Sequence, residues 1–289
     1  MPALLIGPLE FELTRWALIE ATIVSIACGV LGVLVVLRGL SFIGDALSHC
    51  VVPGVVVAYL THANQEILGS MAALLSAWGI ALLTRHRVLG SDPTIAVVFT
   101  WAFALGLALI SATRSYMSDL TEILFGAILA VRPEDLAVSG GVALLVLVAV
   151  IVFYWPLIFV SFDPVAARAQ GLPVDRIDLI FFGLLALAVV SGLTAVGSML
   201  VTGLLIVPAA TARLLARRVA TQMVCSASVG CAASWIGLYT SYYFDIASGG
   251  SIVLAAVLLF AVALLVSPLK GIVPEWLRRR YRVASTSAS

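Results

Sequence analysis

The feature that most constrains this chain is a succession of apolar stretches of about 20 residues, separated by short polar segments. A helix of that length crosses the hydrocarbon core of a bilayer and satisfies its own backbone groups in lipid. Nine spans are predicted, at residues 14–37, 41–60, 67–84, 92–111, 136–160, 177–196, 198–216, 221–243 and 250–267. We therefore predict an all-α polytopic membrane protein, with residues 1–289 forming a single transmembrane domain and 14–267 its helix bundle.

Charge is scarce along the whole chain. Only 11% of the residues are charged and 62% are hydrophobic, whereas soluble domains contain about 25% charged residues. A net charge of +1 gives no basic surface for nucleic acid. The four cysteines lie in apolar runs without a CxxC spacing, so no disulfide framework is predicted.

The basic residues set the predicted orientation, because cytoplasmic loops are enriched in Lys and Arg. In the favoured orientation, only Arg15, Arg114 and Arg132 of the 16 basic residues lie outside. Nine spans then place the N-terminal side outside and the C-terminal side inside. Residues 270–289 become a basic cytoplasmic tail.

One further apolar segment, residues 123–131, is too short to cross a bilayer. It lies on the predicted outer side, between the fourth and fifth spans. We expect a re-entrant or interfacial segment there, with Phe125 and Leu129 as residues of an outer gate.

Two polar residues interrupt the second span. Asp45 and His49 lie four residues apart in a run that is otherwise uncharged. Positions i and i+4 share one face of a helix, so a carboxylate and an imidazole point the same way. An ionisable group at membrane depth costs roughly 2.5–3.5 kcal/mol, which indicates that both side chains face something other than lipid. The spacing leaves three interpretations open: a packed polar network, a proton relay or a metal site.

As a metal site, two ligands from one chain would be too few for tight binding. If two copies pair about a twofold axis along the second span, two Asp45 and two His49 side chains converge. Four oxygen and nitrogen ligands without a thiolate suit Mn²⁺, Fe²⁺ or Zn²⁺. Each imidazole must be neutral to ligate, so binding is expected to weaken at acid pH.

The largest predicted cytoplasmic connection, residues 161–176, contains the signals of a short helix. Asp163 suits the N-cap, Pro164 the first helical position and Gly171 the position just after the C-cap. A helix this short is marginal alone in water. It is expected to pack either against a partner protein or against its own bundle, with Arg168 near its C-terminal end.

Several motifs together resemble a known family. They are LRGLSFIGDALSHCVVPGVVVAY at 37–59, LGSDPTIAVVFTWAFALGLALIS at 89–111, ILFGAILAV at 123–131 and AVGSMLVTGLLIVPAATARLLA at 195–216. The loop FDPVAARAQGLPVD also matches the family's coupling region in position and character. On these residues the chain resembles the permease subunits of the ABC-3 family, which belong to metal-ion ABC importers with cluster A-I binding proteins.

The resemblance implies a type II-like importer permease in a bacterial cell membrane, carrying manganese, zinc or iron. It implies a second permease copy, two cytoplasmic ATP-binding subunits and an extracytoplasmic metal-binding protein as partners. Asp45 and His49 match the family's metal-coordinating positions, and the segment with Asp163, Pro164, Arg168 and Gly171 matches the coupling helix. The metal is cargo, so no cofactor is expected. The chain is expected not to be an enzyme, because it contains no GxxxxGK[ST] loop.

The preferred ion and two other transport classes stay open at this stage. GDALSH followed by VPG is more typical of manganese and iron members than of zinc members, and Cys50 stands where the family often has Ala. A proton-coupled secondary transporter would use Asp45 and His49 as a relay. An ABC permease for a chelated cargo, such as a siderophore, would need a wider pathway.

Overall fold

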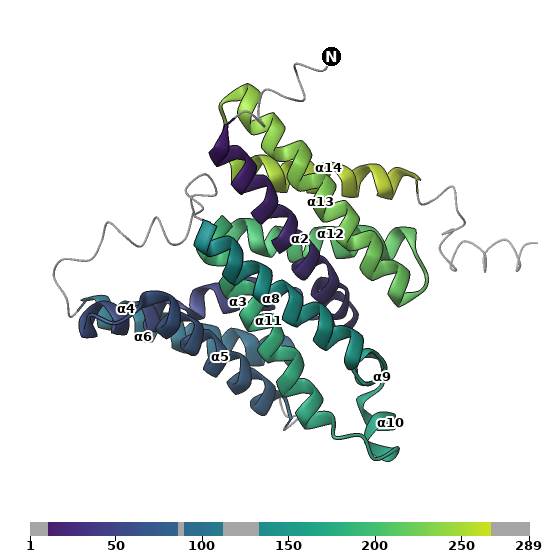
Figure 1. Ribbon diagram of the computed structural model, residues 1–289. Coiled ribbons are helices and arrows are strands. Elements are labelled where there is room, and N and C mark those ends of the chain that lie inside the picture. Colours follow the sequence, from purple (N-terminus) through teal and green to yellow (C-terminus); the bar gives the residue numbers. More distant parts are fainter. Residues whose placement is uncertain (1–10, 86–89, 112–132, 267–289) are drawn as a thin grey trace, which may run out of the picture.

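The computed structural model describes residues 11–85, 90–111 and 133–266 (Figure 1). In this part of the chain all regular secondary structure is helical. The helices are α2 (Glu12–Arg38), α3 (Ile43–Cys50), α4 (Val52–Thr61), α5 (Gln65–Thr84), α6 (Ser91–Ser111), α8 (Pro133–Val152), α9 (Tyr154–Phe162), α10 (Pro164–Ala169), α11 (Val174–Val196), α12 (Ser198–Leu215), α13 (Val219–Phe244) and α14 (Ser248–Val266). The predicted outer gate at Phe125 and Leu129 and the tail at 270–289 lie outside the described residues.

Nine helical segments of the described chain are long and apolar enough to cross a membrane, with α3 and α4 counted as one. The predicted all-α membrane bundle is confirmed. Two of the predicted spans are divided, the second at Val51 and the fifth at Phe153. Each division lies just before a proline, Pro53 or Pro156, which has no N–H to donate to the carbonyl four residues earlier.

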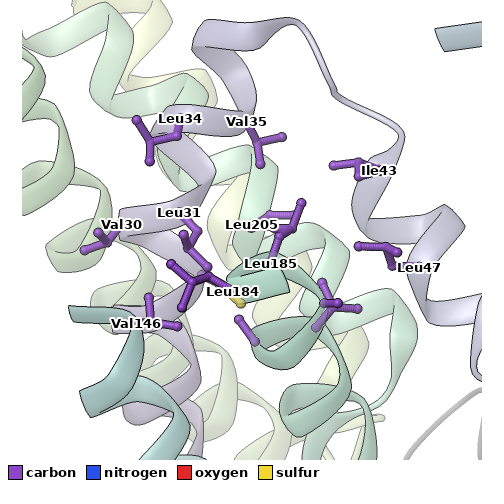
Figure 2. Packing of buried hydrophobic residues seen from close by; sticks show 14 of the residues in the cluster. Val30, Leu31, Leu34, Val35, Ile43, Leu47, Val146, Leu184, Leu185 and Leu205 are labelled. Atoms are coloured by element: carbon purple, nitrogen blue, oxygen red, sulfur yellow. The ribbon is translucent and has the colours of Figure 1, made fainter. Parts of the chain in front are cut away.

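Helix α2 lies at the centre of the bundle and packs against α13, α12, α8 and α11 (Figure 1). Its inner residues include Leu31 and Leu34, both with 0% of their surface exposed. Figure 2 shows these side chains beside Leu205 of α12 and Leu185 of α11. The same apolar cluster includes Ile43 of α3, so the polar pair in the second span is carried by a helix anchored to this core.

Glycines allow several helices of the bundle to approach closely. A Cβ atom on Gly32 would lie 1.9 Å from the carbonyl oxygen of Leu205 on α12. A Cβ atom on Gly237 of α13 would lie 2.3 Å from the Cα atom of Ile252 on α14. Any larger side chain at either position would push two helices apart.

Candidate functional site

Helix α3 presents Asp45 and His49 on its one incompletely buried face. All of its other residues, from Ile43 to Cys50, are buried. The Asp45 side chain is 56% exposed and the His49 side chain 23% exposed in the single chain. Nε2 of His49 lies 3.7 Å from Oδ1 of Asp45, so the predicted common face of the two side chains is observed.

The separation between these two atoms suits a shared cation. At 3.7 Å the pair is too far apart for a direct hydrogen bond. A transition-metal ion about 2.1 Å from a carboxylate oxygen and an imidazole nitrogen can bridge the two atoms. Within the described residues, no group of three or more His, Cys, Asp or Glu side chains is placed to hold a metal. One chain therefore offers two ligands, which favours transient rather than tight binding.

Two phenylalanines of α6 contact the imidazole of His49. The ring centroid of Phe99 lies 5.6 Å and that of Phe103 5.5 Å from the imidazole centroid. Nδ1 of His49 is buried with no hydrogen-bond partner, which leaves Nε2 as the nitrogen on the Asp45 side. Sequence reasoning did not identify Phe99 or Phe103, because nothing local relates α6 to α3.

The backbone around His49 follows from the VPG sequence. Pro53 cannot donate to the carbonyl of His49, so α3 ends at Cys50 and α4 begins at Val52. Gly54 then lets α4 press against α5, since a Cβ atom there would lie 2.2 Å from the carbonyl oxygen of Leu68. The motif thus divides the span immediately after its polar pair and holds the second half against a neighbouring helix.

Three other residues of ligand type lie elsewhere in the structure. Cys50 is fully buried and interacts with Ser76 of α5, on a different face of α3 from His49. His62 has a left-handed backbone conformation, with a φ of 52°, and forms the C-cap of α4. Asp245 likewise forms the C-cap of α13, with a φ of 53°. None of these three residues joins Asp45 and His49.

The connection between α9 and α11 forms the predicted capped helix, α10. Oδ1 of Asp163 accepts from the backbone N–H groups of Val165 and Ala166, both at 2.9 Å. Pro164 takes the first helical position. Gly171, with a φ of 81°, donates to the carbonyl of Arg168, and Leu172 donates to that of Ala167. These two bonds form a Schellman motif, which confirms the caps predicted for this segment.

Helix α10 projects beyond the long helices at the end of the molecule opposite the N-terminal side (Figure 1). It is largely exposed, except for Ala167. Phe162 is 64% exposed and Val165 57% exposed, so this end carries an apolar surface. Arg168 is tied to the bundle, since its Nη2 donates to Oδ1 of Asp175 at 2.9 Å.

A second, partly buried ion pair joins the helices next to α10. Nη1 of Arg38 donates to Oδ1 of Asp178 at 2.7 Å, and Nε donates to Oγ of Ser161 at 2.9 Å. The guanidinium carbon lies 4.0 Å from the ring centroid of Phe181. Arg38 is the last residue of α2, so it joins the helix before Asp45 to α9 and α11, the helices on either side of α10.

Comparison with known proteins identifies relatives over nearly the whole chain. The model of the ABC 3 transport family matches residues 10–267. The manganese transport system membrane protein MntC of Halalkalibacterium halodurans is 41% identical over 281 residues, covering 96% of each chain. A "probable iron transport system membrane protein" of Haemophilus influenzae is 35% identical over 269 residues, covering 93% of this chain and 95% of that protein.

One solved structure matches both the sequence and the fold. The structure "PsaBC from Streptococcus pneumoniae in complex with Fab" contains a chain that is 36% identical and superimposes with a TM-score of 0.78. The match covers 91% of this chain and 95% of that chain. The helical arrangement described above is therefore shared with a protein of known structure.

Proposed function

The chain belongs to the ABC 3 transport family, and we propose that it imports a divalent transition metal, with Asp45 and His49 in the metal pathway. It is a multi-pass membrane permease and not itself an ATPase. Manganese is the favoured cargo, because a relative described as a manganese transport protein is 41% identical over nearly the full length. Iron, named for another relative, and zinc are the alternatives.

The observation that carries this proposal is the polar face of α3. An imidazole nitrogen and a carboxylate oxygen lie 3.7 Å apart on a helix whose other residues are buried. These are ligand types suited to divalent transition metals. A site with so few ligands releases its ion readily, as a transport pathway requires.

A second copy of the chain would complete the site. The Asp45 side chain is 56% exposed in the single chain, although it belongs to an otherwise buried helix. Two such faces related by a twofold axis would supply two carboxylates and two imidazoles. The arrangement would be narrow, which favours a bare ion over a chelated cargo.

Helix α10 is the proposed contact for the ATP-binding subunits. It is capped at Asp163 and Gly171, and its own residue Val165 exposes an apolar side chain. Arg168 and Asp175 connect α10 to α11. In the proposed cycle, an extracytoplasmic binding protein delivers the ion, the ion passes Asp45 and His49, and movement of α10 changes access to that site.

Uptake of radioactive Mn²⁺ in cells, together with metal retention by the purified complex, tests both roles. The double variant Asp45→Ala with His49→Ala is expected to lose metal retention and uptake. Loss of a residue that only supports a metal ligand lowers metal affinity roughly 10–100-fold, so loss of the ligands themselves should lower it at least as much. Val165→Asp should retain metal but lose uptake, because the change lies on the proposed ATPase contact. His62→Asn is the matched control. His62 is exposed and has a left-handed backbone, which asparagine also tolerates, so metal retention and uptake should both stay unchanged.

Two outcomes would contradict the proposal. Unchanged uptake in the double variant would remove Asp45 and His49 from the pathway. Uptake by the purified chain alone, driven by a pH gradient without ATP, would favour the proton-coupled secondary transporter instead.

A further inference from the structure

Glu20 of α2 is a buried carboxyl group that the proposed pathway does not use. None of its surface is exposed. Both of its carboxyl oxygens are enclosed and neither accepts a hydrogen bond. An ionised carboxylate is rarely buried without a partner or a donor, because it loses its hydration without compensation.

Among the residues that the structure describes, no cation lies near Glu20 to balance a negative charge. The helices that pack against α2 are α8, α9, α11, α12 and α13. Of these, α9 and α13 contain no charged residue, and the charges of α11 and α12 lie near the opposite end of α2. Arg15, on α2 itself, is exposed.

The groups that act on Glu20 come from α8. They are the hydroxyl of Ser139 and the carboxylate of Asp135. The acidic neighbour Asp135 disfavours a further negative charge at this position. The electrostatic surroundings therefore favour a neutral carboxyl group.

The hydrogen bonding of Ser139 also favours the neutral form of Glu20. Its single hydroxyl hydrogen is donated to the backbone carbonyl of Asp135, with the oxygens 2.9 Å apart. An ionised Glu20 would find no donor there. A protonated Glu20 is itself a donor, and the Ser139 oxygen retains a lone pair to accept from it.

We propose that Glu20 is a proton-binding site enclosed between α2 and α8. The carboxyl group holds a proton while the two helices are packed together, and it releases the proton to water when that contact opens. The released proton leaves a carboxylate, which only a hydrated, opened contact can accommodate. Proton binding and the packing of α8 on α2 are thereby linked.

The site does not depend on metal transport, but α8 and α9 connect it to the element proposed to drive transport. Helix α8 leads through α9 directly into α10. A displacement of α10 can therefore reach the α2–α8 contact through α8. This last link rests on the proposed function, whereas the proton-binding site stands without it.

Infrared spectroscopy of the full-length permease in lipid vesicles tests the proposal directly, because a neutral carboxyl group and a carboxylate absorb at different frequencies. At neutral pH the wild type should show a carboxylic acid C=O band that Glu20→Gln lacks. The matched control is Glu66→Gln, at an exposed glutamate of α5, which should leave this band unchanged. If Glu20→Gln removes no acid band, Glu20 is ionised and the proposal is wrong.

A second variant keeps the test decisive if Glu20→Gln does not fold. Ser139→Ala retains Glu20 and removes the acceptor of its proposed hydrogen bond, so the acid band should shift to higher frequency. An unshifted band would overturn the assignment of Ser139 as the acceptor and with it the proposed site. Neither measurement involves metal or ATP, so failure here is distinct from failure of the proposed transport function.

The link to packing has its own readout in the pH dependence of unfolding. Stability falls with rising pH wherever the folded state holds a proton that the unfolded state has lost. The wild type should therefore lose stability relative to Glu20→Gln as the pH rises above the ordinary pKa of glutamate, about 4.3. The difference in slope should correspond to a single proton, and parallel curves would contradict the link.

Discussion

The two ends of helix α2 differ in whether a buried ionisable side chain has a partner. At the end next to α10, Arg38 has only 10% of its side chain exposed but has Asp178 at 2.7 Å and Ser161 at 2.9 Å. Nearer the other end, Glu20 is 0% exposed and neither of its oxygens accepts a hydrogen bond. About 27 Å of helix separates these two residues, at 1.5 Å per residue.

The difference separates a residue that holds helices together from one suited to bind a proton. The partners of Arg38 come from α9 and α11, so the ion pair fixes three helices where α10 is attached. Glu20 forms no such connection. Its burial is explained by a change in protonation, whereas the burial of Arg38 is explained by a counter-charge.

Removing the counter-charge of Arg38 should have the largest effect on stability. Asp178→Asn is expected to lower the free energy of unfolding by about 2–4 kcal/mol, because a mostly buried guanidinium loses its charged partner. Denaturant unfolding in detergent, followed by circular dichroism, measures the change. The apolar double variant Arg38→Met with Asp178→Leu should recover much of the loss, since no charge is then left unpaired. A change below about 0.5 kcal/mol in Asp178→Asn would show that the pair has no structural role.

In the same denaturant experiment, Glu20→Met should raise the free energy of unfolding or leave it unchanged. Glu20 has no charged partner to strand, and Ser139 keeps its own bond to the carbonyl of Asp135. An unbranched apolar side chain of similar shape is therefore expected to leave stability unchanged or raise it by up to about 2 kcal/mol. A loss of similar size would mean that Glu20 has a stabilising partner. The contrast between the two ends of α2 would then disappear.

Breaking one of the exposed ion pairs beside α10 should have the smallest effect on stability. It tests whether burial decides how much an ion pair contributes. Arg85 and Arg168 both pair with Asp175; each arginine side chain is 43% exposed and the aspartate side chain 36% exposed. Arg85→Ala should cost less than about 1 kcal/mol, because water screens the charges and Asp175 keeps Arg168. The remaining effect should vanish at high salt. A loss as large as that of Asp178→Asn would show that pairing matters here irrespective of burial.

Local patterns predicted the membrane spans and both candidate functional segments. The i, i+4 spacing of Asp45 and His49 placed them on one face, and the cap residues Asp163 and Gly171 delimited α10 within a residue. The divisions at Val51 and Phe153 were not predicted, although Pro53 and Pro156 were visible signals for them. The metal role of Asp45 and His49, and the coupling role of α10, remain proposals.

The partners of these residues could not be read from the chain. Phe99 and Phe103 contact His49 only because α6 packs on α3. Arg38 and Asp178 are 140 residues apart, and no local rule relates them. In the sequence, Glu20 resembles any acidic residue near the start of a span, and its burial follows only from the packing of other helices on α2.

The sequence by itself determined where the helices lie, which residues share a face and where the short helix α10 begins and ends. Those properties depend on contacts between residues one or two turns apart, which composition and spacing report directly. Only the tertiary structure decided which buried ionisable group receives a counter-charge and which does not. That outcome depends on the groups that distant helices bring to each position, and α2 received an aspartate at Arg38 and an occupied serine hydroxyl at Glu20.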